Sequence, residues 1–273
     1  PYAEPFTLLS YRFVITLFFL LILIIYKKSP WPETRLDFFH LLIAGVLIHG
    51  VYLGGVFQAL KWGMPAGLGA MVIGLQPIGM ALVAGVLLKE EVSKKQWTGL
   101  IMGLVGLYLV LFDSLDLTEQ IAFDGFPIWA VFAVIISLFA ISIGTIYQKR
   151  FCSNMNLYSG AWVQYFSASI LCILIVLFFE NGEVSWSRTF ILAMTWQVLG
   201  LSIGAILLLM TMIKKDALAS VGSYFYLVAP LVAIQAWFLF EETIGLSALA
   251  GVVLISFGVA ITTSKKSIRN LQS

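Results

Sequence analysis

Long apolar runs separated by short polar segments extend along the whole chain. A helix needs roughly 20 residues to cross a hydrocarbon core of about 30 Å. Nine runs approach or exceed this length, at residues 6–26, 38–60, 65–88, 96–112, 127–147, 157–179, 190–213, 217–240 and 244–263. Barrel strands are about half as long, and a spanning helix satisfies its own backbone hydrogen bonds. The pattern therefore predicts an all-α integral membrane protein with nine transmembrane helices in this chain.

Composition supports a lipid environment. Hydrophobic residues occupy 60% of the 273 positions and charged residues 11%, against roughly 45–50% and 25% in soluble domains. The mean hydropathy is +0.99. A soluble globule is excluded, and the lipid bilayer is an expected partner. Two cysteines, Cys152 in a polar connection and Cys172 inside an apolar run, offer neither a disulfide framework nor a metal cluster, so redox chemistry is not expected. We expect no metal, no cofactor and no nucleic-acid partner.

Lys and Arg residues are unevenly distributed between the two predicted sides of the membrane. One side carries only Lys61 and Arg188, while Arg12 lies inside the first run. The other side carries Lys27, Lys28, Arg35, Lys89, Lys94, Lys95, Lys149, Arg150, Lys214, Lys215, Lys265, Lys266 and Arg269. The positive-inside rule places this second set in the cytoplasm. We therefore expect a multi-pass protein of the cytoplasmic (inner) membrane with a cytoplasmic C-terminus and Pro1 outside.

The two halves of the sequence match at an offset near 152 residues. The segment that ends at Pro77 aligns with the segment that ends at Pro230. The aligned pairs are Lys61 with Lys214, Gly69 with Gly222, Glu90 with Glu242, Gly99 with Gly251, and Gly106 with Gly258. Aligned positions fall on opposite sides of the membrane, so the repeat is predicted to be inverted, as in secondary transporters.

An inverted repeat needs an odd number of helices in each half. The second half supplies five and the first only four, so ten helices are expected in the native protein, the absent one lying before Pro1. A cleaved signal peptide is the alternative explanation for an outside start without Met. The expected organisation is a first repeat over 1–113, a second over 127–264 and a cytoplasmic tail over 265–273.

Three segments resemble a known family. QPIGMALVAGVLLKEEVSKKQWTGLIMGLVGLYLVL, from Gln76 to Leu111, and APLVAIQAWFLFEETIGLSALAGVVLISFGVAI resemble the closing helix pairs of two EamA domains, and PFTLLSYRFVI is similar to the start of the second family helix. The resemblance covers nearly the whole chain and points to the EamA family of the drug/metabolite transporter superfamily. It implies ten helices, two cytoplasmic termini and a central cavity. Related proteins move amino acids, sugars, nucleotides and drugs, so the substrate stays open.

Pro77 and Pro230 are the sharpest local signal, since each removes a backbone donor in the middle of a predicted span. Matched helix interruptions in two halves indicate a transporter site, although both prolines could simply bend helices. Beside the first lies Gln76. Ser223 and Tyr226 share the helical face of the second. We interpret the prolines as helix breaks with a gating role and Gln76, Ser223 and Tyr226 as substrate-binding candidates.

Two ionisable residues lie deep inside predicted spans, where such groups are costly and indicate function. His49 has Tyr52 three residues on, on the same face, and both are substrate-binding candidates; a hydrogen bond between helices is the structural alternative for His49. Arg12 lies two turns from the outer end of its span. We interpret it chiefly as a residue that extends its charge to the membrane surface, with substrate contact as the alternative.

The sequence favours a secondary transporter of small metabolites that works by alternating access, an exporter or exchanger of amino acids or related compounds. Drug efflux and metabolite uptake are alternatives. An integral membrane enzyme is a remote one, because paired carboxylates, a nucleophile elbow and a phosphate loop are absent from the sequence. The predictions thus include a small-molecule substrate, no catalytic residues, and a monomer or homodimer.

Overall fold

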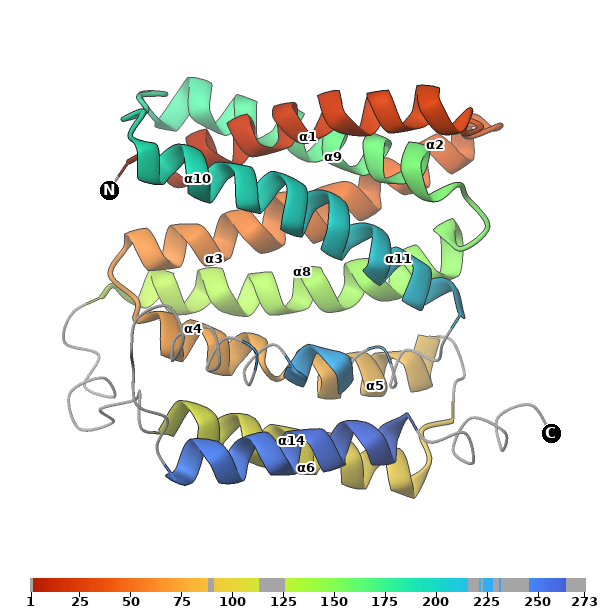
Figure 1. The fold of residues 1–273 in the computed structure, drawn as a ribbon, viewed down its shortest axis with the longest axis vertical. Coiled ribbons are helices and arrows are strands. Elements are labelled where there is room, and N and C mark those ends of the chain that lie inside the picture. The colour runs from red at the N-terminus through yellow and green to blue at the C-terminus, as the bar shows by residue number, and fades with distance from the viewer. Residues whose placement is uncertain are drawn as a thin grey trace. The chain divides into compact units, whose positions relative to one another are not determined.

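The computed structural model describes residues 2–87, 91–112, 126–215, 221, 223–227, 231 and 246–263. All regular elements in these ranges are helical, apart from one isolated bridge between Ala3 and Val184 (Figure 1). Five helical segments within them are long and apolar enough to cross a membrane: Pro5–Lys27, Arg35–Lys61, Ile128–Cys152, Leu157–Phe179 and Arg188–Lys215. The predicted all-α membrane class is confirmed for this part of the chain.

The chain divides into two compact units. The first contains Pro1–Lys61 and Phe139–Lys215, and the second contains Trp62–Leu138 and Asp216–Ser273. Each unit therefore combines segments from both predicted repeats, so repeats in the sequence and units in space are different divisions of the chain.

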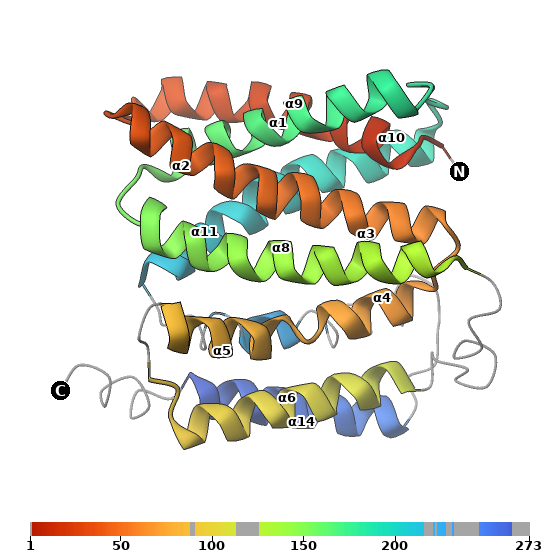
Figure 2. The same cartoon turned by 180° about the vertical axis from the view of Figure 1, so that it is seen from behind.

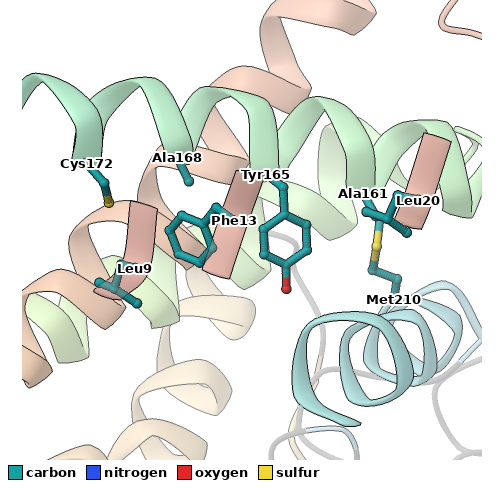
Figure 3. Packing of buried hydrophobic residues seen from close by; sticks show 8 residues of the cluster. All are labelled: Leu9, Phe13, Leu20, Ala161, Tyr165, Ala168, Cys172 and Met210. Atoms are coloured by element: carbon teal, nitrogen blue, oxygen red, sulfur yellow. The ribbon is translucent and has the colours of Figure 1, made fainter. Parts of the chain in front are cut away.

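The first unit is organised around two helices that lie side by side, α1 (Pro5–Lys27) and α9 (Leu157–Phe179) (Figures 1 and 2). Their shared core contains Leu9, Phe13, Leu20, Ala161, Tyr165, Ala168, Cys172 and Met210 (Figure 3). The Phe13 and Tyr165 rings pack at 5.4 Å between centroids. These two residues, like Leu9 with Ala161 and Leu20 with Cys172, are 152 positions apart, which is the offset of the sequence repeat.

The remaining helices of the first unit include two long spans, each containing a π-helical segment. One span consists of α2 (Arg35–Gly45), the π-helix η1 (Val46–Val51) and α3 (Tyr52–Lys61). The other consists of α10 (Arg188–Trp196), the π-helix η2 (Gln197–Ala205) and α11 (Ile206–Lys215). The C-terminal part of α8 (Ile128–Cys152), from Phe139 onward, also belongs to this unit.

A carboxylate from another helix caps the start of α1. Glu180, directly after α9, accepts hydrogen bonds from the backbone N–H groups of Phe6 and Thr7 at 3.0 and 2.7 Å. The first N–H groups of a helix lack partners within it, and the helix dipole favours a negative charge there. Nearby, Lys61 donates a hydrogen bond to Glu4, which lowers the pKa of that exposed carboxyl.

The second unit contains α4 (Ala66–Ile73), α5 (Gln76–Leu87), α6 (Lys94–Phe112), the short 3₁₀ helix η3 (Phe225–Leu227), α14 (Leu246–Thr262) and the first part of α8. Figures 1 and 2 show α6 and α14 packed along each other. The predicted span over 65–88 is interrupted between Ile73 and Gln76, and Pro77 is the second residue of α5. Pro230 lies outside the described residues.

Glycines bring α6 and α14 into close contact. A Cβ atom on Gly99 would lie 2.4 Å from the Gly258 carbonyl oxygen, and one on Gly106 would lie 2.7 Å from the Gly251 carbonyl oxygen. The reverse contacts are equally short, at 2.6 Å from Gly258 to Gly99 and 2.5 Å from Gly251 to Gly106. Gly99 aligns with Gly251 in the sequence repeat and Gly106 with Gly258, so each of these two contacts is the repeat counterpart of the other.

We expect Gly99→Ala and Gly251→Ala to destabilise the protein, because each added methyl group would overlap a backbone carbonyl. Overpacking of this kind costs about 1–3 kcal/mol or more. Gly69→Ala is the control, since its Cβ would meet only the Met64 sulfur, at 4.0 Å. Thermal unfolding in detergent measures the effect, and equal melting temperatures for the three variants would contradict the close glycine contact.

Candidate functional site

A buried arginine lies in the middle of the first unit. The Arg12 side chain is 5% exposed. Its Nε atom donates a hydrogen bond to Ser202 Oγ at 2.8 Å and its Nη1 atom donates one to Gln197 Oε1 at 3.4 Å. Both acceptors belong to η2. The prediction that Arg12 extends to the membrane surface is wrong, because oxygens on a neighbouring span satisfy its donors inside the bundle.

Aromatic rings border the arginine. The His49 ring stacks on the Tyr165 ring at 4.2 Å between centroids and 17° between planes, and Phe13 lies 6.3 Å from His49. The Tyr165 hydroxyl donates to the Ser202 carbonyl oxygen at 3.1 Å. Ser202 thus accepts one hydrogen bond on its side chain and another on its backbone, which joins α1 and α9 to η2.

Two of the buried polar side chains in this cluster have unused hydrogen-bonding atoms. His49 and Gln164 are each 1% exposed. His49 Nε2 and both polar atoms of the Gln164 amide make no hydrogen bond of standard geometry with the described residues. His49 lies within interaction distance of Arg12 and Gln164. A buried polar group without a partner costs about 1–3 kcal/mol, so the arrangement favours a polar ligand.

Tyr52 lies at the edge of this cluster. It is half-buried, it begins α3 directly after η1, and it lies close enough to Arg12 to interact electrostatically. We define the polar cluster as Arg12, His49, Tyr52, Gln164, Tyr165, Gln197 and Ser202. It contains two of the five predicted substrate-binding residues, His49 and Tyr52.

The two π-helical segments present residues to the polar cluster. His49 lies in η1, and both Gln197 and Ser202 lie in η2. His49 and Ser202 are 153 positions apart, which is the same offset that aligns Lys61 with Lys214. π-Helical turns are rare and concentrate at functional sites. Two of them at equivalent positions of a repeat therefore mark this cluster as the candidate site of the first unit.

The other predicted site residues belong to the second unit. Gln76 is 2% exposed, and its amide nitrogen lies 3.5 Å from the Met80 sulfur. Ser223 is fully buried, and Tyr226 packs its ring against Gly103, where a Cβ atom would lie only 2.4 Å away. The Tyr226 hydroxyl has no hydrogen-bond partner among the described residues.

The sequence analysis did not place Gln164, Tyr165 or Ser202 in the site, and it gave Arg12 a peripheral role. One available signal was the repeat itself, because Arg12 and Phe13 align with Gln164 and Tyr165. Another was the cost of a guanidinium inside a span. Neither signal shows which neighbour accepts the hydrogen bonds of Arg12.

Comparison with known proteins identifies the class. A model of the EamA-like transporter family matches residues 1–112 and 128–264. The uncharacterized inner membrane transporter YedA of Escherichia coli K12 is 24% identical over 257 residues, which cover 94% of this chain and 79% of that protein. A probable amino-acid metabolite efflux pump of Salmonella typhimurium is 25% identical over 149 residues, or 55% of this chain and 46% of that protein.

A solved structure supports the same fold. A crystal structure with 19% sequence identity superposes with a TM-score of 0.79 and covers 96% of this chain and 89% of its own. Some curated relatives are matched over only about half of their length. The fold and the family match define a multi-pass membrane transporter. The chain belongs to the EamA-like transporter family, which confirms the resemblance found in the sequence.

We expect Ser202→Ala to destabilise the protein by about 1.5–3 kcal/mol, because the Arg12 donor would lose its nearest acceptor in a buried position. Ser169→Ala is the matched control: Ser169 is also buried in the first unit, but it donates only to the Phe166 carbonyl of its own helix. Thermal unfolding in detergent distinguishes the two. Equal losses of stability would show that the Arg12 bond does not hold η2 in place.

Proposed function

We propose that this protein is a secondary transporter that exports or exchanges amino acids or related small metabolites by alternating access. The observation that carries the proposal is the family match across both halves of the chain. The Salmonella relative named as a probable amino-acid metabolite efflux pump supports the substrate class. Drug efflux and metabolite uptake are the competing transport functions, and an enzymatic role is not proposed.

Many secondary transporters achieve alternating access with two related halves. We propose the inverted repeat of five-helix units, over 1–113 and 127–264, with ten helices in the native protein. Contacts between repeat-related helices support it in each unit. In the first, Phe13 packs against Tyr165. In the second, Gly99 packs against Gly258 and Gly106 against Gly251. Equal lengths of 23 residues for α1 and α9 agree with the same symmetry.

Within this function, His49, Tyr52, Gln76, Ser223 and Tyr226 are proposed to contact substrate. The helix interruptions associated with Pro77 and Pro230 are proposed to take part in gating. Burial in apolar helices supports roles for His49 and Gln76, because a polar side chain inside a span is costly unless it binds something.

Transport in proteoliposomes tests the function. We expect unlabelled external amino acid to accelerate efflux of the same labelled amino acid, since an alternating-access exchanger returns faster when loaded. His49→Leu and Gln76→Leu should weaken substrate binding by about fivefold to more than a hundredfold, the effect of one buried hydrogen bond. His40→Gln is the control, because His40 binds Tyr147 away from the polar cluster. A wild-type protein that moves no member of an amino-acid panel would refute the substrate class.

Topology is a separate prediction, carried by the distribution of Lys and Arg. Alkaline phosphatase fused after Arg269 should be inactive, because the C-terminus is expected in the cytoplasm. A fusion after Gly182, on the side with few basic residues, should be active. The reverse pair of activities would overturn the orientation.

A further inference from the structure

We propose that Arg12 binds the carboxylate of a zwitterionic, amino-acid-type substrate, whose ammonium group is held by Gln164 and His49. The inference rests on the proposed transport function and assigns the chemistry of its substrate to named groups of the polar cluster. Arg12, Gln164 and Ser202 are new to the site, because the sequence had given substrate contact chiefly to other residues.

The charge of Arg12 favours an anionic group on the ligand. Arg12 is always protonated, and Ser202 Oγ and Gln197 Oε1, the two oxygens it binds, are neutral. Among the described residues, one ion pair is formed, between Lys61 and Glu4 at the protein surface. A buried charge that is solvated only by neutral groups favours an anion beside it. A carboxylate matches the planar fork of a guanidinium and can accept two parallel hydrogen bonds.

Polar atoms on α9 and η1 can hold a cationic group of the ligand. The Gln164 amide oxygen and His49 Nε2 can each accept a hydrogen bond. Neither makes one of standard geometry among the described residues, although the two side chains lie within interaction distance of each other. They belong to α9 and η1, whereas Arg12 belongs to α1 and donates toward η2. A ligand with a carboxylate and an ammonium group can bind both Arg12 and the acceptors on Gln164 and His49. A ligand with one charged group can bind only one of these two sides.

The two repeats place different side chains at equivalent positions of the polar cluster. Arg12 aligns with Gln164, and Ser202 aligns with His49, so the two sides of the cluster are equivalent in position but different in chemistry. One side presents a cation and the other presents neutral acceptors. The stacked His49 and Tyr165 rings, with Phe13 beside them, add aromatic surface near which an ammonium group is stabilised. A zwitterion fits this polarity in one orientation.

Three probes separate the two halves of the ligand. L-phenylalanine carries both charges, L-phenylalaninamide lacks the carboxylate, and 3-phenylpropanoate lacks the ammonium group. We expect L-phenylalanine to raise the melting temperature of the purified full-length protein, and each analogue to bind roughly 10- to 100-fold more weakly, the effect of hydrogen bonds to a charged group. Equal stabilisation by all three compounds, or by none, would overturn the proposal without any variant.

Variants then test which residue binds the carboxylate and which binds the ammonium group. Arg12→Gln should abolish the preference for L-phenylalanine over its amide, and Gln164→Leu should reduce the preference for L-phenylalanine over 3-phenylpropanoate. Arg12→Lys should keep part of the first preference, because it keeps the charge but not the fork. Arg188→Gln, which removes an exposed arginine, is the matched control and should change neither preference. An Arg12→Gln protein that folds and still prefers the acid to the amide would refute the assignment.

The binding and transport experiments fail separately. Selective binding of L-phenylalanine without transport would refute the proposed function and support this site. Transport of amino acids with an unchanged acid-to-amide preference in Arg12→Gln would support the function and refute the site.

Discussion

A polar side chain inside a lipid-embedded bundle has no water to bind, so its partners must come from neighbouring helices or from a ligand. This constraint accounts for the arrangement around Arg12. The guanidinium on α1 binds two oxygens on η2, and Tyr165 on α9 binds the Ser202 backbone on the same segment. The α1 helix is thereby held to two consecutive spans that lie more than 100 residues further along the chain, α9 and the span that contains η2. The polar atoms of the Gln164 amide and His49 Nε2 make no hydrogen bond of standard geometry within the part of the chain that the structure describes.

Small residues allow the helices of this protein to pack closely. Lipid tails are as apolar as leucine, so helices in a membrane gain little from simply hiding apolar surface, and they depend on close contact instead. Gly99, Gly106, Gly251 and Gly258 allow the α6 and α14 backbones to meet. In the first unit Gly45 performs the same role against α9, where a Cβ atom would lie 2.2 Å from the Gln164 carbonyl oxygen. This close approach places η1, and with it His49, next to the residues of α9 that form the polar cluster.

The repeats in the sequence and the compact units in space are related but different. Each unit takes segments from both halves of the chain, and at its centre a helix packs against its repeat counterpart, α1 against α9 and α6 against α14. Phe13 meets its equivalent Tyr165, whereas Gly99 meets Gly258, the equivalent of Gly106. A helix that packs against its own counterpart places chemically different residues in equivalent positions on either side of the contact. The difference between Arg12 and Gln164 is such a case, and it gives the cluster its polarity.

The sequence by itself determined that the chain lies in a membrane, and it determined the class of fold and the family. Run lengths near 20 residues leave only membrane helices, and the motifs ending at Pro77 and Leu111 are local enough to be recognised without coordinates. It also identified His49 as an ionisable side chain whose placement inside a membrane span is costly in free energy. Only the tertiary structure decided what Arg12 does, because an arginine two turns inside a span can extend to the surface or bind inward, and the choice depends on whether another helix supplies oxygens. Ser202 and Gln164 are ordinary residues in an apolar run until η2 and α9 bring them to Arg12 and His49. Hydrogen-bond partners on separate helices depend on packing and helix rotation, which no local pattern in the sequence records.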